Sequence, residues 1–335
     1  MAFNILSLSG GGYLGLYTAT VLAELEDQYG QPLASKFDLL AGTSIGGIIA
    51  LGLAANKPAE EIKRAFERNG ESIFSSRPQA TSGPRKLWDI NRSMWSSKYD
   101  GTGLRKAVSE VIDTEMLIGD LRHRVIIPTV NLTKGTPQLF KTPHHEDFRR
   151  DHKIKVSDVA VATSAAPTYF PVAEIGDELF ADGGLYANAP DQLAVHEAEY
   201  FLEIPIEEIN VLSIGTTTTQ FSMSHVTQRD LGIVGWGSNL ASTIISSQQM
   251  LAVYMLEHRL GKRYVRIDTI QSAVQERDLG LDVATKDAQQ TIRGLASGAV
   301  QAVLNNPKVN QIMKSQAPNP KFFYGKFADK DGGAA

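Results

Sequence analysis

Short apolar runs alternate with longer segments of helical periodicity along the first part of the chain. Residues 3–8 and 37–41 are predicted strands, and between them apolar positions recur at helical spacing as far as Tyr29. A glycine-rich loop follows the first strand, and a glycine-flanked serine follows the second. This order of strand, loop, helix, strand, turn and helix predicts an α/β fold with a mostly parallel central sheet and helices on both faces.

Later segments continue this alternation. The hydrophobic pattern predicts helices at 56–69, 104–111, 155–162, 239–261 and 286–304, and strands at 125–131, 178–181, 209–215 and 263–268. Pro128 has no N–H for a sheet ladder, so we predict that the strand containing it lies at an edge or has a bulge.

The pattern breaks between residues 72 and 100, where the chain is rich in Ser, Arg and Lys and also carries aromatic residues. A solvated surface excursion and a lid that contacts an anionic lipid surface are both compatible with this composition. No linker rich in Gly and Ser marks a boundary elsewhere. We therefore predict a single domain at 1–335, with a core at about 3–215, this insertion, and a C-terminal helical extension at about 232–317.

Composition limits the chemistry. The chain has 335 residues and a net charge of −4, which gives no electrostatic basis for binding DNA or RNA. It contains no cysteine, which excludes disulfides, a thiolate nucleophile and cysteine-ligated metals. The first residues lack a secretion signal, and no apolar run reaches the roughly 18 residues of a membrane span. We therefore predict a cytoplasmic protein that touches membranes only from the side.

Three of the seven histidines, His144, His145 and His152, lie in a polar loop. Clustered imidazoles are able to bind a metal ion, but no acidic spacing motif accompanies this group. We predict exposed loop histidines and no metal site.

Ser44 stands at the junction between the second predicted strand and an apolar helix. Gly42, Thr43 and Gly46 complete the pattern Gly-x-Ser-x-Gly, and residues 45–55 carry no proline or charge that would interrupt a helix. Glycines on both sides permit a sharp turn that lifts the serine hydroxyl out of the packing. Because the pattern also arises by chance in ordinary turns, the context of strand, turn and helix is what favours a catalytic nucleophile.

Gly10, Gly11, Gly12 and Gly15 allow two interpretations of the first loop. The spacing Gly-x-Gly-x-x-Gly between a strand and a helix is the fingerprint of a dinucleotide site, as in an NAD-dependent oxidoreductase. That fingerprint expects an acidic residue about 20 positions further on, where this chain has the serine turn instead. The alternative is an oxyanion hole, because unobstructed N–H groups at a helix N-terminus can converge on a negatively charged oxygen.

Asp182 is the second candidate reactive group. It directly follows the strand predicted at 178–181 and precedes Gly183 and Gly184. A carboxylate in this position is able to act as a general base for a neighbouring hydroxyl. A simple Asp-Gly hairpin turn is the alternative interpretation.

In this order, the segments 9–12, 42–46 and 182–184 resemble the motifs of the patatin-like phospholipases, and residues 162–171 resemble the segment between that family's nucleophile and aspartate. The resemblance extends over roughly residues 5–214. It implies a patatin-like three-layer fold in which the serine turn is a nucleophile elbow.

The resemblance also implies site residues and a reaction. Ser44 and Asp182 would form a catalytic dyad without histidine, and Gly10, Gly11 and Gly12 would supply the oxyanion hole. The substrate would be a membrane glycerophospholipid, whose fatty acyl esters are hydrolysed without a cofactor.

Leu14 departs from the family pattern, in which Arg or Lys usually stands between the glycine triplet and the next glycine. A cation there can hold a phosphate or steady the loop. Either another basic residue takes this role or catalysis is weakened. We predict that Leu14→Arg raises phospholipid hydrolysis.

Residues 5–19 and 246–268 are similar to the bacterial patatin phospholipases that cyclic dinucleotides activate in CBASS antiphage defence. This similarity implies a cyclic dinucleotide as an allosteric activator and peripheral contact with the inner membrane, and it leaves open whether a homo-oligomer forms on activation. As nucleotide contacts we select polar and basic residues of two segments, namely Thr216, Thr217, Arg259 and Lys262.

Two further interpretations stay open beside the phospholipase that a cyclic dinucleotide activates and the NAD-dependent oxidoreductase. One is a lipid acyl hydrolase with a housekeeping role that needs no nucleotide. The other is a catalytically weakened module that only binds lipid or nucleotide.

Overall fold

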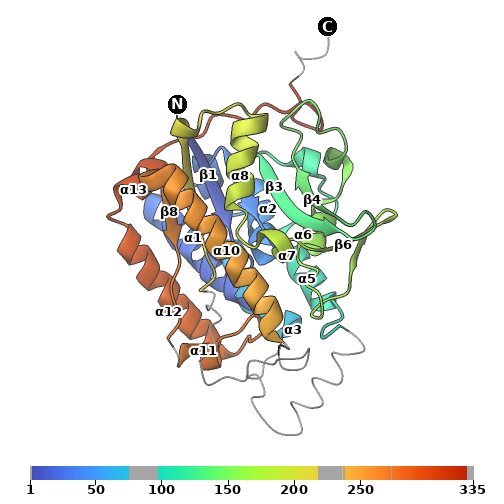
Figure 1. Ribbon diagram of the computed structural model, residues 1–335, viewed down its shortest axis with the longest axis vertical. Coiled ribbons are helices and arrows are strands. Elements are labelled where there is room, and N and C mark those ends of the chain that lie inside the picture. Colours follow the sequence, from blue (N-terminus) through green and yellow to red (C-terminus); the bar gives the residue numbers. More distant parts are fainter. Residues whose placement is uncertain (1, 75–96, 218–235, 237, 273, 330–335) are drawn as a thin grey trace.

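An eight-stranded mixed sheet forms the centre of the computed structural model, which describes residues 2–74, 97–217, 236, 238–272 and 274–329 (Figure 1). The strand order is β5-β6-β3-β2-β1-β7-β8, and β4 pairs with β3. The strands are β1 Phe3–Leu8, β2 Leu39–Gly42, β3 Val125–Asn131, β4 Thr136–Lys141, β5 Ala173–Ile175, β6 Glu178–Asp182, β7 Ile209–Ile214 and β8 Tyr264–Ile267.

The middle of the sheet is parallel and buried on both faces. β1 lies between β2 and β7, parallel to both, and every one of its residues is buried. Leu6 and Leu8 pack into the larger of two apolar clusters, whereas Phe3 and Ile5 pack into the smaller one on the opposite face. A strand covered on both faces is mostly apolar, as β1 is apart from the buried polar residues Asn4 and Ser7.

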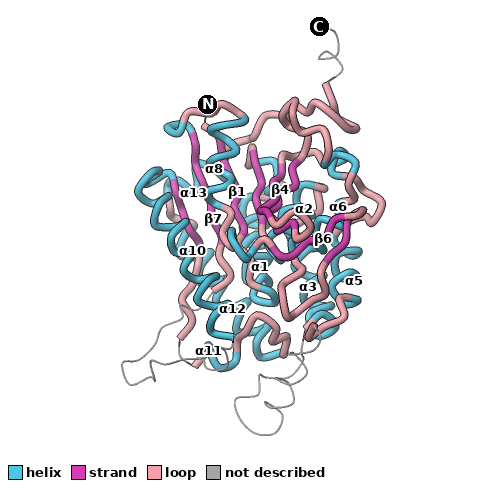
Figure 2. The backbone as a smooth tube through the Cα atoms, turned by 45° about the vertical axis from the view of Figure 1, so that its right-hand side comes forward, coloured by secondary structure: helices cyan, strands magenta, loops and turns pink. Residues whose placement is uncertain are grey.

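Helices cover both faces and give three layers, as predicted (Figure 2). The larger cluster is covered mainly by α1 Gly15–Tyr29, α2 Ile45–Ala54, α3 Ala59–Ile73, α5 Thr102–Val111, α6 Val156–Thr163, α12 Lys286–Val303 and α13 Pro307–Lys314. The smaller cluster is covered by α8 Asp191–His196 and α10 Ser238–Leu260, which cross in front of the strands in Figure 1. Two further helices are short, α7 Gly184–Ala187 and α11 Gln275–Asp278.

The prediction that the strand of Pro128 lies at an edge or has a bulge is wrong, because β3 has partners on both edges and its register with β4 is unbroken. On one edge, β3 pairs with β2 through Val125 and Ile126 and then with β6 from Thr129 onward. On its other edge, β3 pairs antiparallel with β4. Pro128 therefore falls where the pairing with β2 has ended and the pairing with β6 has not begun. Its missing N–H costs no ladder hydrogen bond on that edge, so the strand tolerates it in the sheet interior.

Part of the predicted organisation lies outside the described residues. The insertion predicted at 72–100 is described only at its two ends, and the C-terminal extension predicted at 232–317 is described from α10 onward apart from residue 273. Among the described residues, none of the helices combines the length and apolar character needed to cross a bilayer.

Candidate active site

Ser44 sits on a strained turn between β2 and α2. Its backbone has φ 55° and ψ −126°, a left-handed conformation that a residue with a side chain rarely adopts. A Cβ on Gly42 would collide with the carbonyl oxygen of Gly46, and a Cβ on Gly46 would collide with that of Leu8. Glycine is therefore required at both positions, because the neighbouring backbone carbonyls approach too closely for a side chain. The turn leaves the Ser44 side chain partly exposed.

Hydrogen bonds from other elements hold this turn. The Ser44 N–H donates to Thr163 Oγ1 at 3.0 Å, and the Thr163 hydroxyl donates to the Pro128 carbonyl at 2.7 Å. The Thr43 hydroxyl donates to the Ala187 carbonyl at 2.6 Å. Strained backbone persists only where its surroundings fix it, and here α6, β3 and α7 all contribute.

The structure brings Asp182 to Ser44. Oδ1 of the carboxylate accepts a 2.7 Å hydrogen bond from the Gly184 N–H, and the Ser44 hydroxyl lies close enough to favour the charged form of the carboxylate. Asp182 is only 5% exposed, and this burial raises its pKa from 3.8 to about 6, although Gly184 and Ser44 oppose the change. No hairpin follows it, because Gly184 begins α7. A carboxylate with this pKa is suited to act as a general base near neutral pH.

The glycine loop also reaches Ser44. A Cβ on Gly10 would lie 3.1 Å from Ser44 Cβ, so the loop and the serine turn are in direct contact. Gly10 itself is clamped: its N–H donates to the Asn188 carbonyl at 2.9 Å, and its own carbonyl accepts from Asn188 Nδ2 and Thr216 Oγ1 at 3.2 and 3.1 Å. The prediction that Gly10 donates to an oxyanion is therefore not met here, because its N–H already has an acceptor.

Gly11 and Gly12 are the remaining donors of the triplet. The next two N–H groups are engaged, since Tyr13 donates to the Leu281 carbonyl at 2.7 Å and Leu14 to the Gly11 carbonyl at 3.1 Å. Within the described residues, the N–H groups of Gly11 and Gly12 have no such acceptor. Two adjacent N–H groups without a backbone acceptor, in the loop that contacts Ser44, are therefore the candidate donors of an oxyanion hole.

Leu14 belongs to the apolar core. Its side chain is 4% exposed and packs in the larger cluster. An arginine there would have to bury its charge, so the structure argues against the expectation that Leu14→Arg raises hydrolysis.

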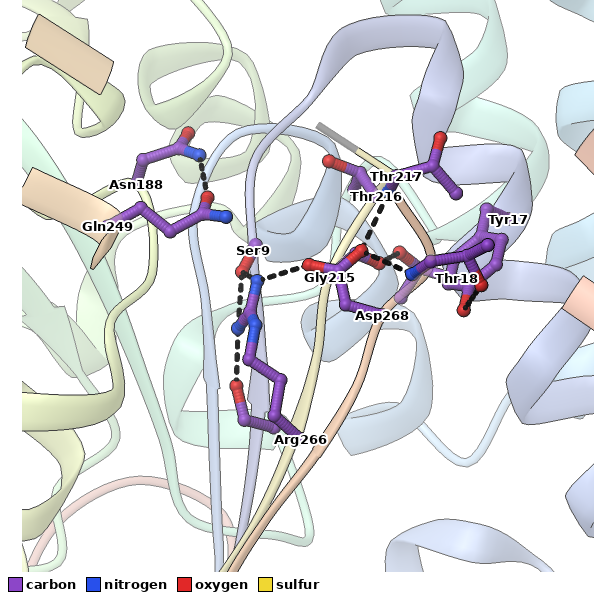
Figure 3. Close-up of polar contacts among 12 residues, drawn as sticks. Ser9, Tyr17, Thr18, Asn188, Gly215, Thr216, Thr217, Gln249, Arg266 and Asp268 are labelled. Atoms are coloured by element: carbon purple, nitrogen blue, oxygen red, sulfur yellow. Dashed lines mark hydrogen bonds and ion pairs between the residues drawn. The ribbon is translucent and has the colours of Figure 1, made fainter. Parts of the chain in front are cut away.

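A different cation, Arg266 at the end of β8, lies under the start of the glycine loop (Figure 3). Its guanidinium donates to Ser9 Oγ at 3.3 and 3.4 Å and to Ser213 Oγ at 2.7 Å. It also pairs with Asp268 at 2.8 Å, and Asp268 accepts the Thr217 N–H at 2.9 Å. Burial alone would lower the pKa of Arg266, but the neighbouring carboxylates raise it, so the side chain stays charged and ties the loop to β7 and β8.

Two glutamines of α10 connect that helix to both candidate catalytic loops. Gln249 Oε1 accepts from Asn188 Nδ2 at 2.8 Å, as Figure 3 shows, and Gln248 Oε1 accepts from the Asn188 N–H at 2.9 Å. Gln248 Nε2 donates to the Gly184 carbonyl. Sequence reasoning missed the role of Asn188, Gln248 and Gln249. Asn188 lies six positions beyond Asp182, but its glutamine partners are some 60 residues further on, so no local pattern joins them.

The predicted nucleotide contacts do not form one site. Thr216 and Thr217 follow the carboxyl end of β7 and are fully buried, where they support the glycine loop. Lys262 precedes the amino end of β8, which is parallel to β7, so it lies at the opposite edge of the sheet. Arg259 pairs with Glu199 at 2.8 Å.

The prediction of exposed loop histidines is wrong for His144. This residue is 3% exposed, and its ring bonds to Glu197 at 3.0 Å and to Thr142 at 2.8 Å. Burial lowers its pKa, with Glu197 opposing that change. The apolar surroundings and a carboxylate partner thus make His144 a structural residue, and the described residues contain no cluster of metal-ligating side chains.

A family model described as patatin-like phospholipase matches residues 6–195, which include the glycine loop, Ser44 and Asp182. The chain belongs to the patatin-like phospholipase family. It is thus a serine lipid acyl hydrolase, and this finding replaces the oxidoreductase interpretation of Gly10, Gly12 and Gly15.

Three bacterial relatives of this patatin-like phospholipase are each named cGAMP-activated phospholipase. The one from Pseudomonas aeruginosa is 43% identical and spans 96% of this chain and 95% of its own. The Vibrio cholerae protein is 38% identical over 84% of this chain and 86% of its own, and the Escherichia coli protein is 34% identical over 94% of each. The similarity therefore includes the C-terminal region that lies beyond the family model.

Proposed function

We propose that Ser44 and Asp182 form the catalytic dyad of this hydrolase and that its substrate is a membrane glycerophospholipid. Ser44 Oγ attacks the carbonyl carbon of a fatty acyl ester while its proton passes to the Asp182 carboxylate. The N–H groups of Gly11 and Gly12 stabilise the negative charge on the tetrahedral intermediate. Such donors are each worth about 3 kcal/mol.

The second half of the reaction reuses the same groups. When the intermediate collapses, Asp182 returns the proton to the leaving alcohol of the lysophospholipid, and the fatty acid stays bound to Ser44 as an ester. Water then attacks this ester while Asp182 accepts its proton, and Asp182 passes that proton to Ser44 Oγ as the fatty acid leaves, which restores the serine.

The observation that carries the proposal is the buried Asp182 carboxylate, which the Gly184 N–H holds, whose charged form the neighbouring Ser44 hydroxyl favours and whose pKa is raised to about 6. A carboxylate with the ordinary pKa of Asp would be a poor proton acceptor for a serine hydroxyl. Burial raises the pKa of Asp182 and so makes the carboxylate more basic, while it stays next to Ser44.

The test is fatty-acid release from phospholipid vesicles by the parent, Ser44→Ala and Asp182→Asn, each checked for native circular dichroism. Both variants are expected to lose at least a thousandfold in rate. Asp147→Asn is the matched control, because the Asp147 side chain is 74% exposed and lies in a surface loop. Full activity of folded Ser44→Ala would overturn the assignment, whereas no fatty-acid release by the folded parent would favour a module that only binds lipid.

We further infer that a cyclic dinucleotide activates this enzyme and that it acts peripherally on the inner membrane from the cytoplasm in antiphage defence. The names of the three relatives support this inference. Thr216 and Thr217 are fully buried, so the exposed cations Arg259 and Lys262 are kept as the proposed nucleotide contacts.

Fatty-acid release should rise on addition of cGAMP and not with unrelated mononucleotides, and Lys262→Ala should raise the cGAMP concentration needed. If release is high without any nucleotide and a panel of cyclic dinucleotides leaves it unchanged, the housekeeping alternative is correct.

A further inference from the structure

The outer face of α10 is apolar. Its exposed side chains include Leu240, Ile244, Met250, Leu251, Tyr254 and Met255, each at least 43% exposed. From Ser238 to Leu256 the helix contains no Asp, Glu, Lys or Arg. A surface helix normally turns polar residues to water, so six exposed apolar side chains on one helix form an unusual apolar surface, although Ser247 is exposed among them. We call these six residues the α10 outer face.

The inner face of the same helix contacts the catalytic centre. Gln248 and Gln249 hold Asn188 and Gly184, which flank the glycine loop and Asp182. Leu256 and Leu260 anchor the helix in the smaller apolar cluster. The outer face thus lies one helix thickness away from the candidate catalytic loops.

The apolar surface continues from α10 toward the site. α7 packs against α10, and the two lie side by side in Figure 1. Leu185 of α7 follows Asp182 by three positions and is 43% exposed. An apolar surface that runs from α10 to the immediate neighbourhood of the general base reaches the point where a lipid substrate must enter.

We propose that the α10 outer face docks on the surface of the phospholipid bilayer that supplies the substrate. The proposal rests on the proposed hydrolysis of membrane phospholipid at Ser44. A bilayer fits this face because docking there desolvates no charged side chain, and because Tyr and Met are suited to the boundary between headgroups and acyl chains. A second copy of the chain fits less well, since covering the surface next to Leu185 would obstruct the route of the lipid to Ser44.

The test compares two exposed tyrosines. Tyr254 on the α10 outer face is 61% exposed, and Tyr200, which lies after α8 and stacks on His196, is 70% exposed. Both are changed to Ser in a Ser44→Ala background, so that no lipid is consumed. Co-sedimentation with vesicles of phosphatidylethanolamine and phosphatidylglycerol, with and without cGAMP, gives the partition coefficient of each protein.

We expect Tyr254→Ser to lower the partition coefficient at least tenfold and Tyr200→Ser to leave it unchanged. With Ser44 restored, Tyr254→Ser should lower the ratio of vesicle hydrolysis to hydrolysis of a soluble short-chain ester by a similar factor. Equal binding by the two variants would overturn the proposal. So would a change of sedimentation coefficient without a change in vesicle binding, since a second copy would then cover the face.

The result is independent of the catalytic assignment. If Ser44→Ala retained fatty-acid release, the proposed dyad would fail, yet the difference in vesicle binding between the two tyrosine variants would still be measured. Leu251→Ser, at a residue 58% exposed, repeats the comparison at a second position and decides it if Tyr254→Ser loses the parent circular dichroism.

Discussion

Replacing Asp182 by Asn is expected to stabilise the folded protein while it abolishes hydrolysis. Asn has the same shape, and its Oδ1 still accepts the 2.7 Å hydrogen bond from the Gly184 N–H. What the variant removes is a negative charge in a side chain that is only 5% exposed. Burying this charge lowers the free energy of unfolding of the parent, and Asp182→Asn removes that penalty.

The raised pKa sets the size and the sign of the effect. Asp182 titrates near 3.8 when unfolded and at about 6 when folded, so the unfolded chain gives up its proton first. Below the lower pKa both states are protonated and the charge costs nothing. Above the higher pKa the cost is complete and amounts to about 3 kcal/mol, because one pKa unit corresponds to ~1.4 kcal/mol. Near pH 5 roughly half of it is present.

Urea denaturation of the parent and Asp182→Asn measures this difference. With an m value of about 3 kcal/mol per molar urea, the midpoint of the variant should lie about 1 M higher near pH 8 and about half as far above the parent near pH 5. Asp147→Asn, at an exposed carboxylate, should show no such pH-dependent gap.

Three outcomes would refute the reasoning. A midpoint of Asp182→Asn below that of the parent near pH 8 would mean that the ionised carboxylate stabilises the fold. A gap that does not change between the two pH values would mean that the charge is not its cause. A gap that widens toward acid pH would mean that folding lowers the pKa of Asp182.

Three further outcomes are expected. The kcat/KM for a soluble ester should fall as the pH falls through about 6, because protonated Asp182 cannot accept a proton, and an activity that is flat down to about pH 4 would contradict its role as base. Asn188→Ala should lower kcat at least tenfold with little change in KM, because its side chain holds the Gly10 carbonyl in the glycine loop. Leu14→Arg should lower both the thermal midpoint and the rate, measured by scanning calorimetry and vesicle hydrolysis, because its position is 4% exposed.

Elements with a strong local pattern were predictable from the sequence. The strand at β1, the serine turn and the helix at α12 each depend on neighbouring residues, and their periodicity or glycine pattern defines them. The contact between Ser44 and Asp182 was reached through the family resemblance, since the two residues lie on separate strands and no spacing rule joins them. The division of the chain into one domain with an insertion stays a prediction.

Positions whose environment is set by distant residues were not predictable. Pro128 was assigned to an edge because the sequence does not reveal that two different strands share one side of β3. His144 was assigned to the surface because its loop is polar, and only the fold brings Glu197 to its ring. In both cases a tertiary contact overrides the local pattern.

The supports of the glycine loop explain why the C-terminal region matters for this enzyme. The loop itself lies inside the segment that the family model matches, residues 6–195, but the groups that hold it lie beyond that segment. Thr216 bonds to the Gly10 carbonyl, Gln249 positions Asn188, and Arg266 bonds to Ser9. α10 is also bonded to Gly184 of α7, and the Ala187 carbonyl of α7 holds Thr43 beside the nucleophile. The C-terminal region is therefore in direct contact with the supports of both the glycine loop and the serine turn.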